Sequence, residues 1–234
     1  MGAIYRREMG AFFTSGVAYV FLAVFYVFSG YYFYNEVIQS GYTDTSPLFS
    51  NMFRIVLFLI PILTMRLLSE EKKNRTDQGL LTAPIGLWEI VVGKYLAAMT
   101  IFVIAESIIF VYSIILGILG DVVWATLLGN YFAMLLLAAA FIAVGIFISA
   151  LTENQMTAAV FSMAVLFFVY LSDSFTERIS SQWLYDIVVQ LSFYSRYIEF
   201  TQGIFNLTSV LFYLSTAFLF NFFTVRVLEK RRWS

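Results

Sequence analysis

A single carboxylate, Glu106, lies about midway along the apolar stretch of residues 90–119. An ionised carboxylate at the centre of a membrane costs at least ~2.5–3.5 kcal/mol, so this residue must be protonated, paired or exposed to water. It could mark a polar point on a transport path or at a seam between subunits. It could equally be a neutral carboxyl hydrogen-bonded inside a helix bundle, and the residue pattern leaves both interpretations open.

Arg54 is a second ionisable residue within an apolar segment, near the outer end of residues 52–68. Its long apolar stem can carry the guanidinium back to the lipid headgroups, which is the preferred interpretation. A pairing with Glu36, or a role at an external gate, remains open.

The remaining residue types exclude several kinds of chemistry. The chain has no Cys and no His, which rules out disulfides, thiolate chemistry, histidine proton relays and the usual zinc or copper sites. It also has no GxxxxGK[ST] phosphate loop, so any ATP hydrolysis must take place on another chain. We therefore expect no cofactor in this chain and no enzymatic activity of its own.

The overall composition is that of a membrane protein. The 234 residues are 61% hydrophobic and 12% charged, whereas soluble domains are roughly 45–50% apolar and about 25% charged. The net charge of −1 gives no reason to expect nucleic-acid binding. We expect an all-α membrane protein with a single membrane domain over residues 1–234.

Six apolar segments are long enough to cross the hydrocarbon layer as helices, which requires about 20 mostly apolar residues. They are residues 16–34, 52–68, 90–119, 125–150, 156–172 and 207–227. In the fourth segment Ala139 and Ala143, and also Gly145 and Ser149, recur four apart, a spacing that permits close helix approach. Packing within one subunit is preferred over a dimer seam as the explanation.

Basic residues sort to one side of this six-span topology. An even number of spans places both termini on that side, and the positive-inside rule assigns it to the cytoplasm. The side holds 11 of the 14 Lys and Arg residues: Arg6, Arg7, Arg66, Lys72, Lys73, Arg75, Lys94, Arg226, Lys230, Arg231 and Arg232. The opposite loops are mainly acidic.

The longest cytoplasmic connection reads MRLLSEEKKNRTDQGLLTAPIGLWEIVVGKYLAA and contains apolar residues that a solvated linker would not need. Leu80, Leu81, Ile85, Leu87 and Trp88 should be buried against lipid headgroups or in a groove of another protein. The run EEKK, then Thr76, LLTAPI and VVGK resembles the cytoplasmic loop of ABC-2 type exporter permeases, especially the gliding-motility and copper-maturation types. A family feature is missing, since Asp77, Gln78 and Gly79 stand where a Leu-Glu pair is common.

The resemblance implies a permease of a prokaryotic cytoplasmic membrane that works with a separate ABC ATPase subunit, where ATP and Mg bind, and with a second permease subunit, identical or related. It implies that the loop forms a coupling helix between spans two and three. The residues implied at the ATPase contact are Glu70, Glu71, Thr76, Leu80, Leu81 and Pro84.

Two more elements are expected outside the spans. Apolar residues between Ser172 and Leu207 recur at helical spacing in pieces too short to cross a membrane, which favours a short re-entrant helical hairpin on the external side. An N-terminal interfacial helix is expected before the first span. Asn206 or Thr208 is expected to cap the last helix.

Two other functional classes are the alternatives to a permease subunit. A self-sufficient secondary transporter or channel often shows inverted repeats and broken helices, whereas the two halves of this chain show no repeat and only Pro61 interrupts a predicted span. An intramembrane enzyme or an assembly scaffold would be the third class, and the usual catalytic constellations are missing. The substrate is left open.

Overall fold

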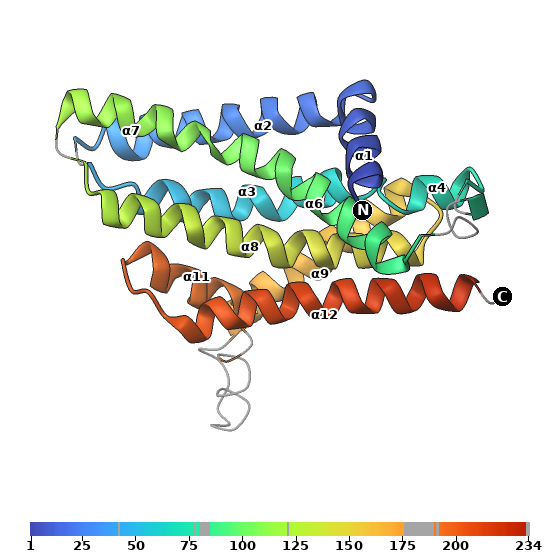
Figure 1. Ribbon diagram of the computed structural model, residues 1–234. Coiled ribbons are helices and arrows are strands. Elements are labelled where there is room, and N and C mark those ends of the chain that lie inside the picture. Colours follow the sequence, from blue (N-terminus) through green and yellow to red (C-terminus); the bar gives the residue numbers. More distant parts are fainter. Residues whose placement is uncertain are drawn as a thin grey trace.

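The structure, a computed structural model, is a bundle of helices lying side by side along one direction (Figure 1). It describes residues 1–41, 43–76, 78–79, 85–120, 122–175, 190 and 192–232, and helices are the only regular secondary structure in these ranges. In that part of the chain five helical segments are long and apolar enough to cross a membrane, with a shorter apolar helix at Gln155–Leu171.

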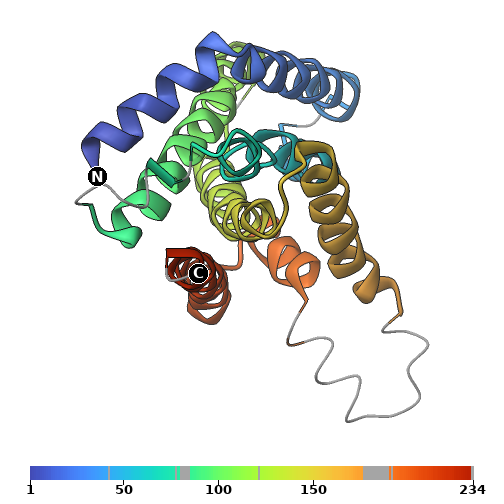
Figure 2. The ribbon, with the colours of Figure 1, turned by 90° about the vertical axis from the view of Figure 1, so that its right-hand side faces the viewer.

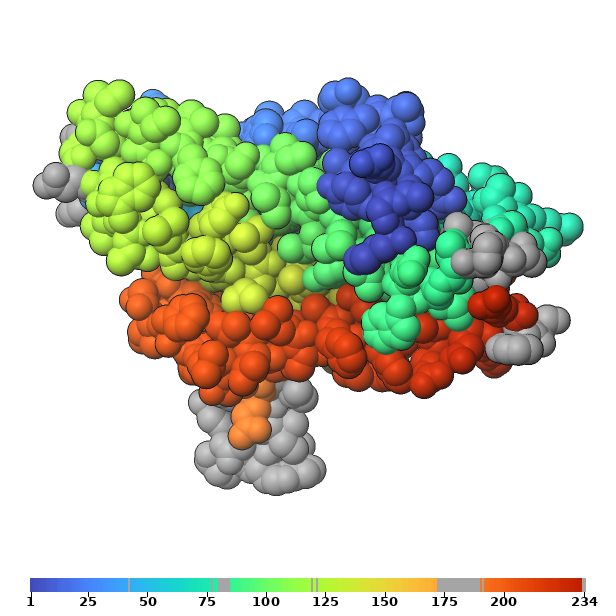
Figure 3. Space-filling model, in the orientation of Figure 1, coloured from blue at the N-terminus to red at the C-terminus, as the bar shows by residue number. Residues whose placement is uncertain are grey.

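The first two helices meet at a sharp corner. Helix α1 (Gly2–Thr14) runs across the end of the bundle, and α2 (Val17–Tyr32) begins after Gly16, whose φ of 78° favours a residue without a side chain. A π-helix, η1 (Phe33–Ile38), extends α2. Figure 3 shows the side chains of α1 seated against those of α6. The expected N-terminal helix ahead of the first span is therefore present.

Helix α3 (Ser46–Thr64) runs back and is followed by the short helix α4 (Ser69–Lys73). Pro61 lies inside α3 without ending it. The third expected span begins as α6 (Leu87–Glu106) and continues as α7 (Ile108–Leu119), with a break at Ser107. The expectation that only Pro61 interrupts a span was wrong. The Ser107 hydroxyl donates to the carbonyl of Ile104 at 2.6 Å, a local bond that competes with regular helix geometry.

Helix α8 (Trp124–Leu151) lies at the centre of the bundle, with α3, α6, α9 (Gln155–Phe175) and α12 (Leu207–Arg232) around it (Figure 2). Its small residues allow close contact. A Cβ atom at Gly145 would lie 2.2 Å from Oγ1 of Thr64, and Ala139 and Ala143 pack with Ala217 of α12. The small residues of α8 thus pack within the chain.

The side chains on the outside of the bundle are apolar, as expected for contact with lipid. Val27 on α2, Ile118 on α7 and Phe168 on α9 are 68%, 81% and 73% exposed. A soluble protein rarely exposes so much contiguous apolar surface. The chain is an integral membrane protein.

The two ends of the bundle differ. The N-terminus, the C-terminal end of α12 and α4 lie at one end, and the link between α7 and α8 lies at the other (Figure 1). At that other end helix α11 (Phe193–Thr201) packs into the bundle through buried Tyr197 and Phe200. The rest of the expected external hairpin, residues 176–189 and 191, lies outside the described residues. Asn206 accepts a hydrogen bond from the backbone N–H of Thr208 at 3.0 Å, which confirms the expected cap of α12.

Candidate functional site

A buried lysine joins three elements at the end of the bundle that carries both termini. Lys94 on α6 is 0% exposed, and its Nζ lies 2.9 Å from Oε1 of Glu8 on α1 and 3.0 Å from Oε1 of Glu71 on α4. The same amine donates to the carbonyl oxygen of Leu67 at 2.6 Å. The ammonium group thus donates two hydrogen bonds, to Glu8 and to Leu67, and forms a second ion pair with Glu71.

Arg7 on α1 completes the cluster. Its NH2 group lies 2.6 Å from Oε1 of Glu8 and also contacts Glu71. Two cations and two carboxylates make the cluster neutral. Lys94, Glu8 and Glu71 are largely buried, whereas the Arg7 side chain is 49% exposed and reaches the surface. We call Arg7, Glu8, Glu71 and Lys94 the charge cluster. It fixes α4 to the N-terminal helix and to the start of the third span.

The segment after α4 is held by backbone bonds to the same glutamate. The N–H and hydroxyl of Thr76 both donate to the carbonyl oxygen of Glu71, at 3.0 and 3.3 Å. Arg75, which directly precedes Thr76, has a φ of 57°, in the left-handed region, as the tight turn requires. The α4 segment therefore ends in a compact loop.

A cavity of about 310 Å³ opens beside the charge cluster. Its lining is mostly polar and includes Arg66, Glu70, Asn74 and Thr76. One carboxylate oxygen of Glu71, Oε2, is buried and has no hydrogen-bond partner in the described part of the chain.

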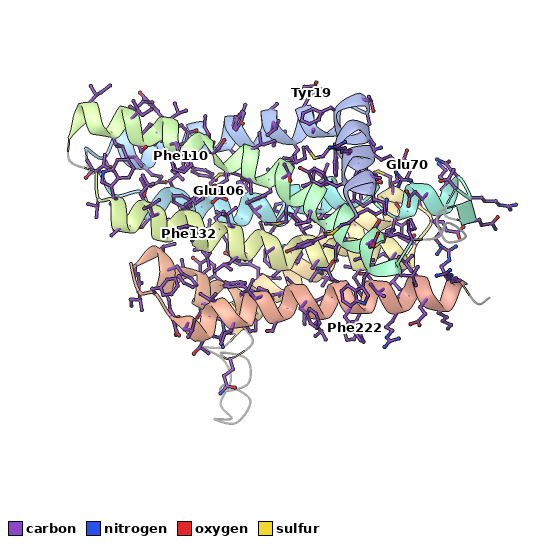
Figure 4. The ribbon with its side chains drawn as sticks, viewed as in Figure 1. Tyr19, Glu70, Glu106, Phe110, Phe132 and Phe222 are labelled. Carbon is purple, nitrogen blue, oxygen red and sulfur yellow. The ribbon has the colours of Figure 1, made fainter. Side chains whose placement is uncertain are left out.

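The structure brings together three of the six residues implied by the loop resemblance. Glu70, Glu71 and Thr76 all line this cavity. Glu70, labelled in Figure 4, forms an ion pair with Arg66, whose Nε lies 3.1 Å from Glu70 Oε2. The other three, Leu80, Leu81 and Pro84, lie outside the described residues.

The apolar residues at the end of the same loop pack against the chain itself. Ile85 and Leu87 contact the hydrophobic core. The ring of Trp88 lies 6.0 Å from that of Phe218 and 6.3 Å from that of Phe222, both on α12. Part of the apolar surface of these three residues is therefore buried within the chain, whereas Trp88 remains 40% exposed.

Glu106 and Arg54 lie far from the charge cluster. Glu106 is 2% exposed at the end of α6, in the interior of the bundle (Figure 4). Arg54 is exposed on α3 and forms no ion pair with Glu36, which instead accepts a hydrogen bond from Asn51 at 3.3 Å. The pairing of Arg54 with Glu36 was therefore wrong, whereas its reach toward headgroups stays a prediction.

Comparison with known proteins agrees with the resemblance seen in the loop. A family model described as ABC-2 family transporter protein matches residues 3–227. The match extends over nearly the whole chain. This chain belongs to the ABC-2 transporter family. A search of curated proteins finds no match. As a member, it is a membrane permease component of a transport system.

Sequence reasoning missed part of the site of this ABC-2 permease. The sequence pattern places Arg7 and Lys94 only among the basic residues on one side of the membrane, and it does not single out Glu8. A signal was available, because Lys94 is the only basic residue in the apolar segment of residues 90–119, and such a residue needs a partner. Which acid would supply that partner could not be read from the chain.

The charge cluster makes the folding stability of this permease depend on pH. Burial alone would raise the pKa of the Glu8 carboxyl, but the Lys94 charge and the hydrogen bonds from Arg7 and Lys94 outweigh burial and hold that pKa below its usual value. A carboxyl with a lower pKa in the folded state stabilises the fold above the unfolded pKa. That contribution is lost as the pH falls through the folded value.

We expect the melting temperature of the detergent-purified permease to fall between about pH 5 and about pH 3, and Glu8→Gln to make this slope shallower. The matched control is Glu229→Gln, which removes a carboxylate that is 42% exposed and paired with Arg226. An identical pH slope in the parent and in Glu8→Gln would show that Glu8 does not contribute.

Proposed function

We propose that this chain is the membrane-spanning permease subunit of an ATP-driven ABC exporter in a prokaryotic cytoplasmic membrane. A separate ATPase subunit binds and hydrolyses ATP with Mg, and a second permease subunit, identical or related, completes the transporter. The observation that carries the proposal is the family match over residues 3–227. The absence of a phosphate loop in the sequence supports the placement of ATP hydrolysis on a partner.

The charge cluster supports a role for α4 and its loop in coupling. A loop that transmits force from an ATPase must be attached rigidly to the helices it moves, since a loose connection would absorb the displacement. Glu71 and Lys94 supply such an attachment, because breaking a buried ion pair is strongly unfavourable. We propose that Glu70, Glu71, Thr76, Leu80, Leu81 and Pro84 form or support the surface that contacts the ATPase.

The proposed orientation has six spans with both termini in the cytoplasm. It is supported by the basic residues, since Arg66, Lys72, Lys94 and the cluster at the end of α12 belong to the end of the bundle that carries the termini. Reporters fused after Ser234 and between Lys72 and Thr76 should both be read as cytoplasmic, and one near Asp44 as external. An external C-terminus would contradict the six-span arrangement.

The contact with the ATPase can be tested at Leu81. If this side chain occupies a groove on the ATPase, Leu81→Asp buries an unpaired charge at a cost above ~2 kcal/mol, and binding should fall more than tenfold. The control is Gln78→Asp, which adds the same charge three residues away at an exposed position. The measurement is co-purification with the ATPase and the ATP turnover of the complex. Normal recovery and normal substrate-stimulated turnover for Leu81→Asp would exclude Leu81 from the contact.

One observation favours the alternative, a self-sufficient secondary transporter. Such proteins bind ions near the membrane centre, at broken helices. The third span here is broken at Ser107, next to buried Glu106. Transport by the purified permease in vesicles without ATP or an ATPase would support this alternative, whereas a strict requirement for both would support the ABC exporter.

A further inference from the structure

Glu106 is buried without a partner in the middle of the bundle. It is 2% exposed, and neither of its carboxyl oxygens has a hydrogen-bond partner in the part of the chain that the structure describes. Buried polar groups in proteins are nearly always hydrogen-bonded to protein or to ordered water. An uncompensated carboxyl at this depth therefore points to a ligand or to a functional role.

Glu106 lines a small cavity between α2, α3, α7 and α8. Its volume is about 20 Å³, and its lining is apolar except for Glu106, Ser29 and Tyr112. A cavity needs about 10–15 Å³ to hold one water molecule, so this space fits one molecule of that size. Glu106, Ser29 and Tyr112 are the lining residues that carry polar groups, and a water molecule here would need at least two of them as partners.

The two hydroxyls of the cavity are fixed in place and retain free lone pairs. Ser29 Oγ and the hydroxyl of Tyr112 lie 2.9 Å apart, and the Tyr112 ring is stacked on Phe33 with centroids 4.2 Å apart. Each hydroxyl has one proton and two lone pairs, so the pair can still accept a hydrogen bond. A water molecule that donates a hydrogen bond to one of these hydroxyls can accept a hydrogen bond from the O–H of a neutral Glu106 carboxyl.

The surroundings of Glu106 contain no compensating cation. The ionisable side chains that face it are tyrosines: Tyr26 on α2, Tyr112 on α7, Tyr131 on α8 and Tyr197 on α11. The α3 residues that line the cavity are Leu48, Phe49 and Met52, which do not titrate. No Lys or Arg of the described residues forms an ion pair with Glu106. A carboxylate anion here would be neither solvated nor paired, which favours the neutral acid.

The break in the third span lies directly beside this carboxyl. Helix α6 ends at Glu106 and α7 begins at Ile108, so the backbone can change direction there without unfolding either helix. The hydroxyl of Tyr26 donates to the carbonyl of Ile104 at 3.2 Å and ties the end of α6 to α2.

We propose that Glu106 is a proton-binding site of this permease, in which the protonated carboxyl binds one water molecule together with Ser29 and Tyr112. The carboxyl releases its proton only when the α6–α7 break opens to water. The O–H bond of the carboxyl then breaks, the proton passes to water, and the carboxylate stays on the protein. The proposal concerns residues of this chain alone, so its test does not require a partner.

The test is infrared spectroscopy of the purified permease in lipid vesicles at neutral pH. We expect the parent to show the carbonyl band of one protonated carboxyl, sensitive to exchange of H₂O for D₂O. Glu106→Gln should lose this band and keep the fold. The matched control Glu153→Gln, which removes a carboxylate that is 66% exposed, should retain the band. Tyr112→Phe and Ser29→Ala should retain the band but shift its frequency, because each removes a partner of the bound water.

Each other outcome overturns the proposal. Absence of a protonated-carboxyl band in the parent, or its persistence in Glu106→Gln, would exclude Glu106 as the proton site. A band that disappears when Na⁺ replaces K⁺ at constant pH would identify a metal cation as the ligand instead. A band unchanged in both Tyr112→Phe and Ser29→Ala would exclude the water site, and this comparison remains decisive if Glu106→Gln does not fold.

Discussion

Lys94→Met should destabilise the permease by about 3–5 kcal/mol, the usual effect of removing one partner from a buried ion pair. The ammonium group of Lys94 forms ion pairs with both Glu8 and Glu71. Methionine keeps the unbranched apolar stem of lysine without its ammonium group and leaves the two carboxylates with Arg7 as their only cation in the cluster. The expected result is a large fall in the melting temperature of the purified protein.

Lys73→Met is the matched control, since Lys73 is exposed on the same α4 and its loss should change stability by less than about 1 kcal/mol. Adding Glu8→Gln to Lys94→Met should restore part of the stability, because it removes one of the unpaired carboxylates. Equal melting temperatures for Lys94→Met and Lys73→Met would mean that the charge cluster does not hold the three elements together.

Gly145→Ala is expected to have the second largest effect, through overpacking where α8 meets α3. The new Cβ atom would lie 2.2 Å from Oγ1 and 2.9 Å from Cβ of Thr64, distances at which the helices must move apart. Overpacking of this kind costs roughly 1–3 kcal/mol and sometimes more, which exceeds the gain of up to about 1 kcal/mol from replacing a helical glycine by alanine. The net result should be a lower melting temperature.

Gly129→Ala provides the comparison within the same helix. Its nearest neighbour would be the carbonyl oxygen of Phe200 at 3.8 Å, an ordinary contact, so the substitution should be neutral or slightly stabilising. Adding Thr64→Ala to Gly145→Ala should recover part of the loss by removing Oγ1 and Cγ2. A Gly145→Ala protein as stable as Gly129→Ala would show that α3 and α8 do not approach as closely as described.

Several features of this protein follow from its sequence alone. Long apolar segments force helices in lipid, because every backbone polar group must be satisfied within the segment. The described helices begin and end within about six residues of the expected segments, the largest difference being the start of α3 at Ser46 instead of residue 52. The run from Glu70 to Lys94 was enough to identify the ABC-2 family, which the family match confirms. The N-terminal helix and the Asn206 cap were also predictable, since they depend on neighbouring residues.

Only the tertiary structure showed how distant segments meet. Glu8 and Lys94 are 86 residues apart in the chain, and nothing in the local pattern of either segment names the other. Spacing indicated that Gly145 permits a close approach, but not that Thr64 is the neighbour. The break at Ser107 and the cavity beside Glu106 were not predicted either, since both depend on packing among several helices. The physical reason is that hydrophobicity and periodicity report what a segment does in its solvent, whereas a buried pair, a close helix crossing or a cavity exists only once particular faces have packed together.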